Sequence, residues 1–191
     1  MKPLHAYLAA RLYWTQPTVL TRSYELHANS PGSEITVARL CFEHPFGSLA
    51  EGQTTTGWWC FRRRGFFESV VTVSSRGCNE TVAAYRPHWT GTRGEITTGQ
   101  GIYTFRTANL WGSRYEIRNE EDEPLITYRS GCPDAGLSSF FKSQSTVTFT
   151  EAGTAEPLID LLVVVGWYLI VLSRDDVAAI TATSSVIVPA S

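Results

Sequence analysis

The sequence predicts a mostly β domain that closes around a single strongly apolar helix near its C-terminus. From about residue 24 to residue 149, the chain is a succession of short segments in which apolar and polar residues alternate, each bounded by Gly, Pro, Asn or acidic residues. Such alternation is typical of half-buried strands joined by turns. Residues 158–172 then read LIDLLVVVGWYLIVL, a stretch with one charge and no amphipathic stripe. These two observations decide the predicted fold class.

Length and composition fit one folded domain over residues 1–191. Apolar residues make up 43% of the chain and charged residues 18%, a balance that supports a packed core rather than disorder. The formal net charge of −2 gives no global basic field, so nucleic acid is not an expected partner. An anionic partner would have to be met by a local group of basic residues.

The strands follow one another at intervals of about 10 to 15 residues, which indicates a meander, sandwich or barrel rather than βαβ units. The first predicted hairpin joins residues 24–27 to residues 35–40 across Ser-Pro-Gly-Ser, a typical turn composition. Residues 1–20 fit either a helix or a strand and stay unassigned. The remaining predicted strands cover residues 56–61, 66–74, 81–86, 94–97, 102–107, 114–118, 125–128 and 146–150.

The clearest alternation lies in residues 114–118, Arg-Tyr-Glu-Ile-Arg. Tyr115 and Ile117 are expected on one face and the three charges on a solvated face. The acids at 120–123 then form a turn, because their mutual repulsion keeps the tip of the hairpin in water.

Residues 158–172 are predicted to form a helix that is covered on every side, either by lipid or by the protein's own core. Asp160 is placed in the first turn and Arg174 beyond the last turn, where the helix dipole favours an anion and a cation respectively. Fifteen residues span only roughly 22 Å, less than the roughly 30 Å hydrocarbon core of a bilayer. We therefore expect a helix buried in protein, with a single-pass membrane helix as the alternative. Gly166 is interpreted as a point where a wall approaches closely, and Trp167 as a core anchor.

The cysteines show no C-x-x-C spacing, so neither a structural zinc site nor any other metal site is predicted. The N-terminus lacks the apolar region and cleavage site of a secretory signal, which predicts reduced thiols and a cytoplasmic protein. The four cysteines are Cys41, Cys60, Cys78 and Cys132.

The order of many short antiparallel strands followed by one wholly apolar helix resembles the tubby-like C-terminal domain superfamily, which includes phospholipid scramblases and LURP-one-related proteins. Tyr24–Leu26 with Ile35–Arg39, Phe61–Phe67 and Trp111–Ile117 are similar to that family's repeated hairpins. The resemblance covers residues 22–174, leaves extensions at 1–21 and 175–191, and indicates a distant stand-alone member. It implies a closed antiparallel β-barrel of about twelve strands around a buried hydrophobic C-terminal helix. The chain lacks the scramblases' proline-rich N-terminus and cysteine cluster, so no family site transfers by position.

One segment carries candidate binding chemistry. Arg62, Arg63 and Arg64 follow Trp58 and Trp59. Guanidinium groups bind phosphate oxygens bidentately and tryptophans favour membrane interfaces, so the segment could hold an anionic lipid headgroup or a nucleic-acid backbone. The absence of a global basic field favours the lipid headgroup. Three consecutive side chains cannot point the same way in a strand, which favours a loop for the arginines. The alternative interpretation is a solvated hairpin tip whose aromatic neighbours fill the core.

No catalytic pattern is found, and a non-enzymatic module without a cofactor is expected. The sequence has no G-x-S-x-G elbow and no glycine-rich phosphate loop. The acids at 120–123 lack the alternating ligand spacing of a calcium loop. The leading hypothesis is therefore a β-barrel that binds anionic membrane lipid as a peripheral protein, and the alternatives are a structural or protein-interaction barrel and a single-pass membrane protein that uses residues 158–172. The histidines, which no motif relates to a nucleophile, are His5, His27, His44 and His88.

Overall fold

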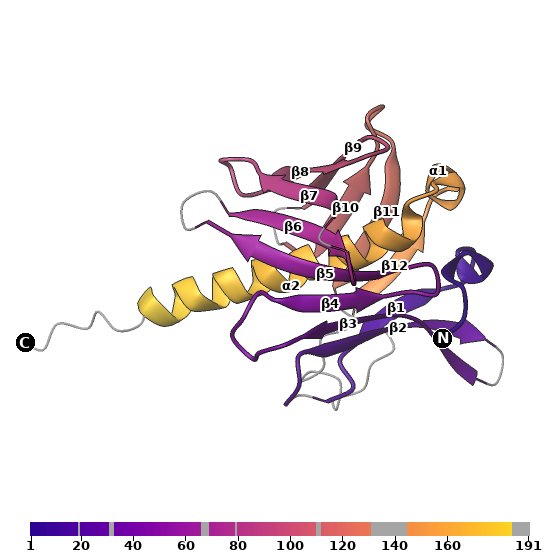
Figure 1. Cartoon of the computed structure of the whole chain (residues 1–191), viewed down its shortest axis with the longest axis horizontal. Coiled ribbons are helices and arrows are strands. Elements are labelled where there is room, and N and C mark those ends of the chain that lie inside the picture. Colours follow the sequence, from indigo (N-terminus) through magenta and orange to yellow (C-terminus); the bar gives the residue numbers. More distant parts are fainter. Residues whose placement is uncertain are drawn as a thin grey trace, which may run out of the picture.

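The described residues form a closed antiparallel barrel of twelve strands with a long helix running through it (Figure 1). The computed structural model describes residues 1–18, 20–30, 33–65, 69–78, 80–109, 112–130 and 145–184. The predicted fold class, a mainly β barrel around a buried C-terminal helix, is confirmed. The strands are β1 (Leu12–Thr15), β2 (Ser23–Ser30), β3 (Ser33–Phe42), β4 (Ala50–Gln53), β5 (Trp58–Arg64), β6 (Val70–Ser75), β7 (Thr81–Pro87), β8 (Arg93–Thr98), β9 (Ile102–Thr107), β10 (Arg114–Arg118), β11 (Pro124–Ser130) and β12 (Ser145–Phe149).

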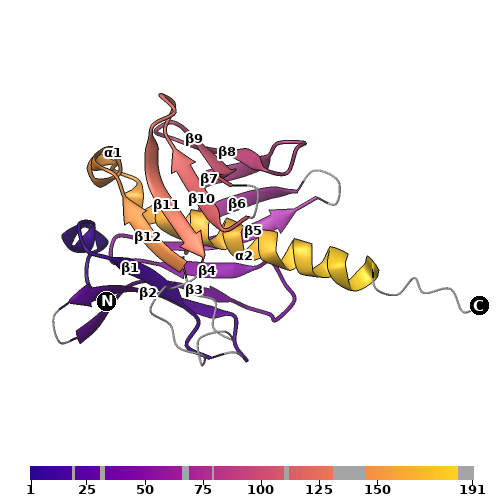
Figure 2. The same cartoon turned by 180° about the vertical axis from the view of Figure 1, so that it is seen from behind.

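Three helical segments accompany the strands: a 3₁₀ turn (Leu4–Tyr7), α1 (Glu151–Ala155) and α2 (Ile159–Ser184). Each strand pairs with the next along the chain, and β1 closes the barrel against β12. Strands β10, β11 and β12 cover α2 on the side seen in Figure 2. Closure removes the sheet edges that would otherwise expose unpaired backbone groups.

The barrel has two distinct ends. Because neighbouring strands are antiparallel, β1 ends and β2 begins at one end of the barrel, and the same end holds the corresponding strand ends of β3 and β4, β5 and β6, β7 and β8, β9 and β10, and β11 and β12. The alternate strand ends meet at the other end. The first turn of α2 lies at the second end, where the Thr56 hydroxyl in the β4–β5 connection donates to the Asp160 carboxylate. The helix leaves at the first end, where Asp176 pairs with Arg63 near the end of β5. We call the first end the exit end and the second the opposite end.

The helix is longer than predicted. Its buried part, Ile159–Leu172, fills the barrel, and Val163, Trp167 and Ile170 are fully buried as expected. The predicted end at Leu172 is wrong, because α2 continues to Ser184 and contains Arg174 within it. The apolar run stops where the helix leaves the barrel, while the residues that follow include neither Gly nor Pro and so sustain the helix in solvent. No helix in the described part of the chain has both the length and the apolar character required to cross a membrane.

Two strands were not predicted. β1 lies in the segment that was left unassigned and was expected to be an extension outside the barrel, yet its Leu12 and Trp14 side chains are buried in the core. The sequence of β4, Ala-Glu-Gly-Gln, has low strand propensity. Gly52 in this strand allows close packing, because a Cβ there would lie 2.5 Å from a methyl carbon of Val164 on α2. β4 is therefore held by its neighbours rather than by local preference, whereas the Leu-Tyr-Trp-Thr sequence of β1 also favours a strand.

Aromatic stacking connects the helix to the barrel wall. The Trp167 ring stacks on Trp14 with centroids 5.4 Å apart and planes at 4°. Tyr168 stacks on Phe61 with a centroid distance of 4.8 Å, and its hydroxyl donates to the Ser48 carbonyl at 2.5 Å. The buried indole nitrogen of Trp167 makes no hydrogen bond to the described residues.

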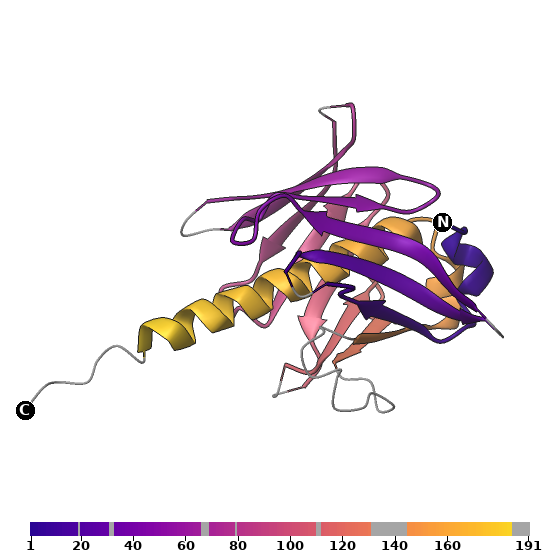
Figure 3. The same cartoon turned by 90° about the horizontal axis from the view of Figure 1, so that it is seen from below.

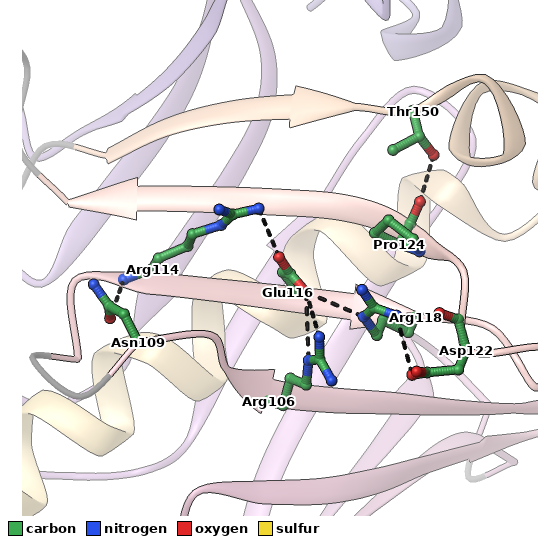
Figure 4. A network of polar contacts seen from close by, with 8 residues as sticks. All are labelled: Arg106, Asn109, Arg114, Glu116, Arg118, Asp122, Pro124 and Thr150. Carbon is green, nitrogen blue, oxygen red and sulfur yellow. Dashed lines mark hydrogen bonds and ion pairs between the residues drawn. The ribbon is translucent and has the colours of Figure 1, made fainter.

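The hairpin β10–β11 keeps the predicted alternation, with one difference. Tyr115 and Ile117 face the core as expected, but Glu116 on the other face is only 3% exposed. Its carboxylate is covered by Arg106, Arg114 and Arg118, at distances of 3.2, 2.8 and 3.1 Å (Figure 4). Burial raises the pKa of Glu116, but hydrogen bonds from Arg118 and Arg106 and the charge of Arg114 together lower it by a larger amount. The pKa of Glu116 therefore lies below its ordinary value. The acids at 120–123 are exposed, as predicted for the turn.

Candidate functional site

The five residues predicted to bind an anionic headgroup lie on β5, and the strand divides them between two faces. The prediction of a loop for Arg62, Arg63 and Arg64 is wrong, because all three continue β5 and pair in register with Thr72, Val71 and Val70 of β6. The valine-rich partner strand extends the hydrogen-bonded ladder to the end of the arginine run. Alternation along the strand then decides the direction of each side chain.

Trp58, Arg62 and Arg64 are exposed on the outer face of the barrel, and Cys60 lies half-buried on the same face. Trp59 and Arg63 point inward with Phe61. The structure therefore brings together three of the five predicted residues and separates the other two from them. Phe66 and Phe67, the second aromatic pair flanking the arginines, lie outside the described residues.

Arg62 and Arg64 line a groove of about 670 Å³ on the outside of β5, β6 and β7. We call it the arginine groove. Its other described lining residues are mainly hydroxyl, thiol and glycine residues, and none is acidic; they are Leu49, Cys60, Thr72, Ser74, Ser75, Gly77, Cys78 and Thr81. A concave surface that combines guanidinium and hydroxyl donors is suited to phosphate or carboxylate oxygens.

The two arginines of the groove have no ion pair within the described residues, whereas many other arginines of the chain do. Glu51 pairs in register with Cys60 on the same outer face, but its carboxylate is held elsewhere. It accepts a hydrogen bond from the indole nitrogen of Trp58 at 3.2 Å and lies 3.6 Å from Arg76. The guanidinium groups of Arg62 and Arg64 therefore remain available to an external anion.

Trp58 lies beside the groove but is occupied by neighbours. The Arg76 guanidinium stacks over its ring at 3.5 Å from the centroid, an arrangement that stabilises both side chains through a cation–π contact. Trp59 is buried and packs against Gly57, so its ring belongs to the core. Of the two tryptophans expected at a membrane interface, only Trp58 is therefore partly exposed.

Arg63 has a structural role at the exit end. Its guanidinium lies 2.8 Å from the Asp176 carboxylate on α2, and Arg22 makes a matching ion pair with Asp175. The two pairs hold α2 against the barrel rim at the start of β2 and near the end of β5. Arg63 is therefore neutralised within the protein and is not available in the way that Arg62 and Arg64 are.

Sequence reasoning did not identify Thr72, Ser74 and Thr81 as groove residues. The alternation of Val71 and Val73 with Thr72 and Ser74 was visible and places the hydroxyl side chains outside. The sequence did not show that β6 pairs with β5, and only this pairing places these hydroxyl groups beside Arg62 and Arg64. Cys60 and Cys78 in the groove are free thiols, as is Cys41, while Cys132 lies outside the described residues. In the part of the chain that is described, no cluster of three or more His, Cys, Asp or Glu side chains could hold a metal ion.

The chain matches no protein-family model, no curated protein and no solved structure.

Proposed function

We propose that this protein is a non-enzymatic β-barrel module that binds anionic membrane lipid, with the headgroup in the arginine groove. The observation that carries the proposal is the pair of exposed guanidinium groups, Arg62 and Arg64, two residues apart on one strand with no acid in the lining around them. Each such basic residue near an anionic membrane contributes about 1 kcal/mol. The Ser74 hydroxyl in the lining adds an uncharged donor, whereas the Thr72 hydroxyl already donates to the Arg62 carbonyl at 3.3 Å.

The resemblance to the tubby-like superfamily is a second part of the proposal. A closed twelve-stranded barrel around a C-terminal helix is the arrangement that this resemblance implies, and the observed topology supports it. We propose a distant stand-alone member of that superfamily, acting as a cytoplasmic protein that attaches peripherally to a membrane.

The test is co-sedimentation of the full-length protein with vesicles of phosphatidylcholine alone and of phosphatidylcholine mixed with phosphatidylserine. Wild-type protein is expected to bind the anionic vesicles only. The double variant Arg62→Gln/Arg64→Gln should lose most of this binding. Its melting temperature should stay nearly unchanged, because exposed charges contribute little to stability.

A matched control separates the groove from net charge. Lys2→Gln/Arg39→Gln removes the same two positive charges from exposed positions away from the groove and should bind as wild type does. Equal loss of binding in the two double variants would show that net charge alone, and not the arginine groove, explains the binding. Absence of anionic-vesicle binding by the wild type would overturn the proposal.

A further inference from the structure

The exit end of the barrel presents large apolar side chains to solvent on three separate connections. Leu20 in β1–β2 is 89% exposed, Phe46 in β3–β4 is fully exposed, and Trp89 in β7–β8 is 90% exposed. These connections lie at the same end because of the antiparallel order of the strands (Figure 1). A single exposed leucine is common on protein surfaces, but three almost fully exposed large apolar side chains at one end of a barrel indicate an interaction surface.

The part of α2 that leaves the barrel adds to the same apolar end. Beyond Asp176, its Val177 and Ile180 side chains are 62% and 66% exposed. They are three residues apart and so lie on one side of the helix. Figure 3 shows this part of α2 extending past the barrel in the direction in which the helix leaves.

An apolar groove opens at the same place. It has a volume of about 340 Å³ and lies between α2 and the strands β6 to β10. Its lining includes Val71, Phe105, Tyr115, Leu172 and Ile180. The exit end thus has apolar surface in two places. One consists of Leu20, Phe46 and Trp89, which we call the apolar tips, and the other lies between α2 and the barrel wall.

Charge is distributed unequally between the two ends. Exposed arginines without an ion pair among the described residues stand at or near the exit ends of their strands, while Asp175 and Asp176 are neutralised by Arg22 and Arg63. Glu43 and Glu95 are the exposed acids of the described exit half that remain without an ion pair. The exposed unpaired arginines are Arg62, Arg64, Arg86, Arg93 and Arg129.

The opposite end is mainly acidic. Its basic residues are Lys2, Arg11, Arg76 and Arg118. Its exposed large apolar side chains, Met1, Trp58 and Ile102, are less than half exposed. Its acids are more numerous. Besides the buried Asp160, they are Glu34, Glu80, Glu120, Glu121, Asp122, Glu123, Glu151 and Glu156. Such a charge asymmetry turns the exit end toward a negatively charged surface.

We propose that the exit end is a membrane-insertion surface, in which Leu20, Phe46, Trp89 and the projecting part of α2 enter the interfacial region of an anionic bilayer. The inference rests on the proposed function and adds to it an orientation and a second set of contacts. Arginines around the rim meet the headgroups while the apolar tips reach the acyl boundary, a combination of two signals that stable peripheral attachment requires. A bilayer fits better than a protein partner, because the tips are single side chains on separate connections rather than one continuous flat patch.

The first experiment locates Trp89 directly. Anionic vesicles containing phosphatidylcholine brominated in its acyl chains should quench part of the wild-type tryptophan fluorescence. In Trp89→Leu the apolar side chain is kept and the fluorophore is lost, so binding should persist and this quenching should disappear. Unchanged quenching in Trp89→Leu would show that Trp89 does not enter the bilayer.

The second experiment removes the apolar tips. Leu20→Ser/Phe46→Ser/Trp89→Ser should weaken partitioning into anionic vesicles by about tenfold or more, because three apolar side chains no longer leave water. Its melting temperature should match wild type, since the three side chains are exposed. The control Ile102→Ser, at the opposite end, should bind as wild type does.

The outcomes separate this inference from the proposed function. If wild type binds anionic vesicles through Arg62 and Arg64 while the triple serine variant binds equally well, the groove binds lipid and insertion at the exit end is wrong. If the triple variant binds weakly but bromine does not quench Trp89, the tips contact headgroups only and insertion is again wrong. If wild type binds no anionic vesicle, both fail, and the apolar tips are then assigned to a protein partner.

Discussion

The phenol of Tyr128 on β11 occupies the space beside α2 that a side chain on Gly166 would need. Its hydroxyl donates a hydrogen bond to the Val163 carbonyl at 3.0 Å, one turn before the glycine. A Cβ built on Gly166 would lie 2.7 Å from Cζ of that ring. The glycine therefore sits in the middle of a helix, where it lowers helix propensity, because the barrel wall comes too close for any other residue.

We accordingly expect Gly166→Ala to destabilise the protein. Alanine is better than glycine in a free helix by about 1 kcal/mol, but overpacking of a rigid core costs about 1 to 3 kcal/mol. Urea unfolding followed by far-ultraviolet circular dichroism measures the difference. Adding Tyr128→Phe removes the hydroxyl and should make the alanine less costly than it is alone. A stabilised Gly166→Ala variant would contradict the close contact.

Trp167→Ala should leave a largely unfolded chain. Trp167 is fully buried and stacked on Trp14, and truncation of a buried tryptophan costs about 3 to 5 kcal/mol, against a whole-domain stability of about 5 to 15 kcal/mol. The measurement is a melting curve with size-exclusion chromatography. Trp89→Ala serves as the control, because the same substitution at an exposed position should leave the melting temperature unchanged. A Trp167→Ala variant that melts within a degree or two of wild type would show that the stack is not needed.

Stability should fall as the pH drops below about 4.5, and Glu116 is one cause. Its pKa is lower in the folded protein than in the unfolded chain, so the ion pairs with Arg106, Arg114 and Arg118 stabilise the fold fully above the unfolded pKa. That contribution is lost as the pH falls through the folded pKa. Urea midpoints measured across this range should fall less steeply for Glu116→Gln than for wild type. Glu121→Gln, an exposed turn residue, should keep the wild-type slope.

Binding to anionic vesicles should weaken steeply as salt is raised through the range in which the Debye length falls below roughly 10 Å. The reason is that Arg62 and Arg64 have no carboxylate in the described lining of the groove and are exposed, so the proposed contact with an anion lies at the surface, where salt screens it. The slope of log affinity against log salt should be smaller for Arg62→Gln/Arg64→Gln than for Lys2→Gln/Arg39→Gln. Equal slopes in these two variants would argue against contacts between the groove and the lipid.

The sequence by itself determined the class of the fold and the place of its central helix. Alternation of Tyr115 and Ile117 with charged neighbours identifies a strand, because side chains on a strand alternate between faces whatever lies beside it. The wholly apolar run ending at Leu172 identifies a covered helix, because no side of it can face water. Gly166 was interpretable for the same local reason, since a glycine in such a helix indicates a close neighbour.

Tertiary structure decided what local pattern does not contain. β4 becomes a strand because its neighbours complete a closed ladder, although residues such as Gly52 have little strand preference. For β1, where the sequence fits a helix or a strand, pairing with β12 and β2 decides for the strand. The division of Arg62 and Arg64 from Arg63 follows from pairing with β6, which extends β5 to the end of the arginine run. The gathering of Leu20, Phe46 and Trp89 at one end depends on strand order alone, because side chains far apart in sequence meet only where closure of the barrel places their connections together.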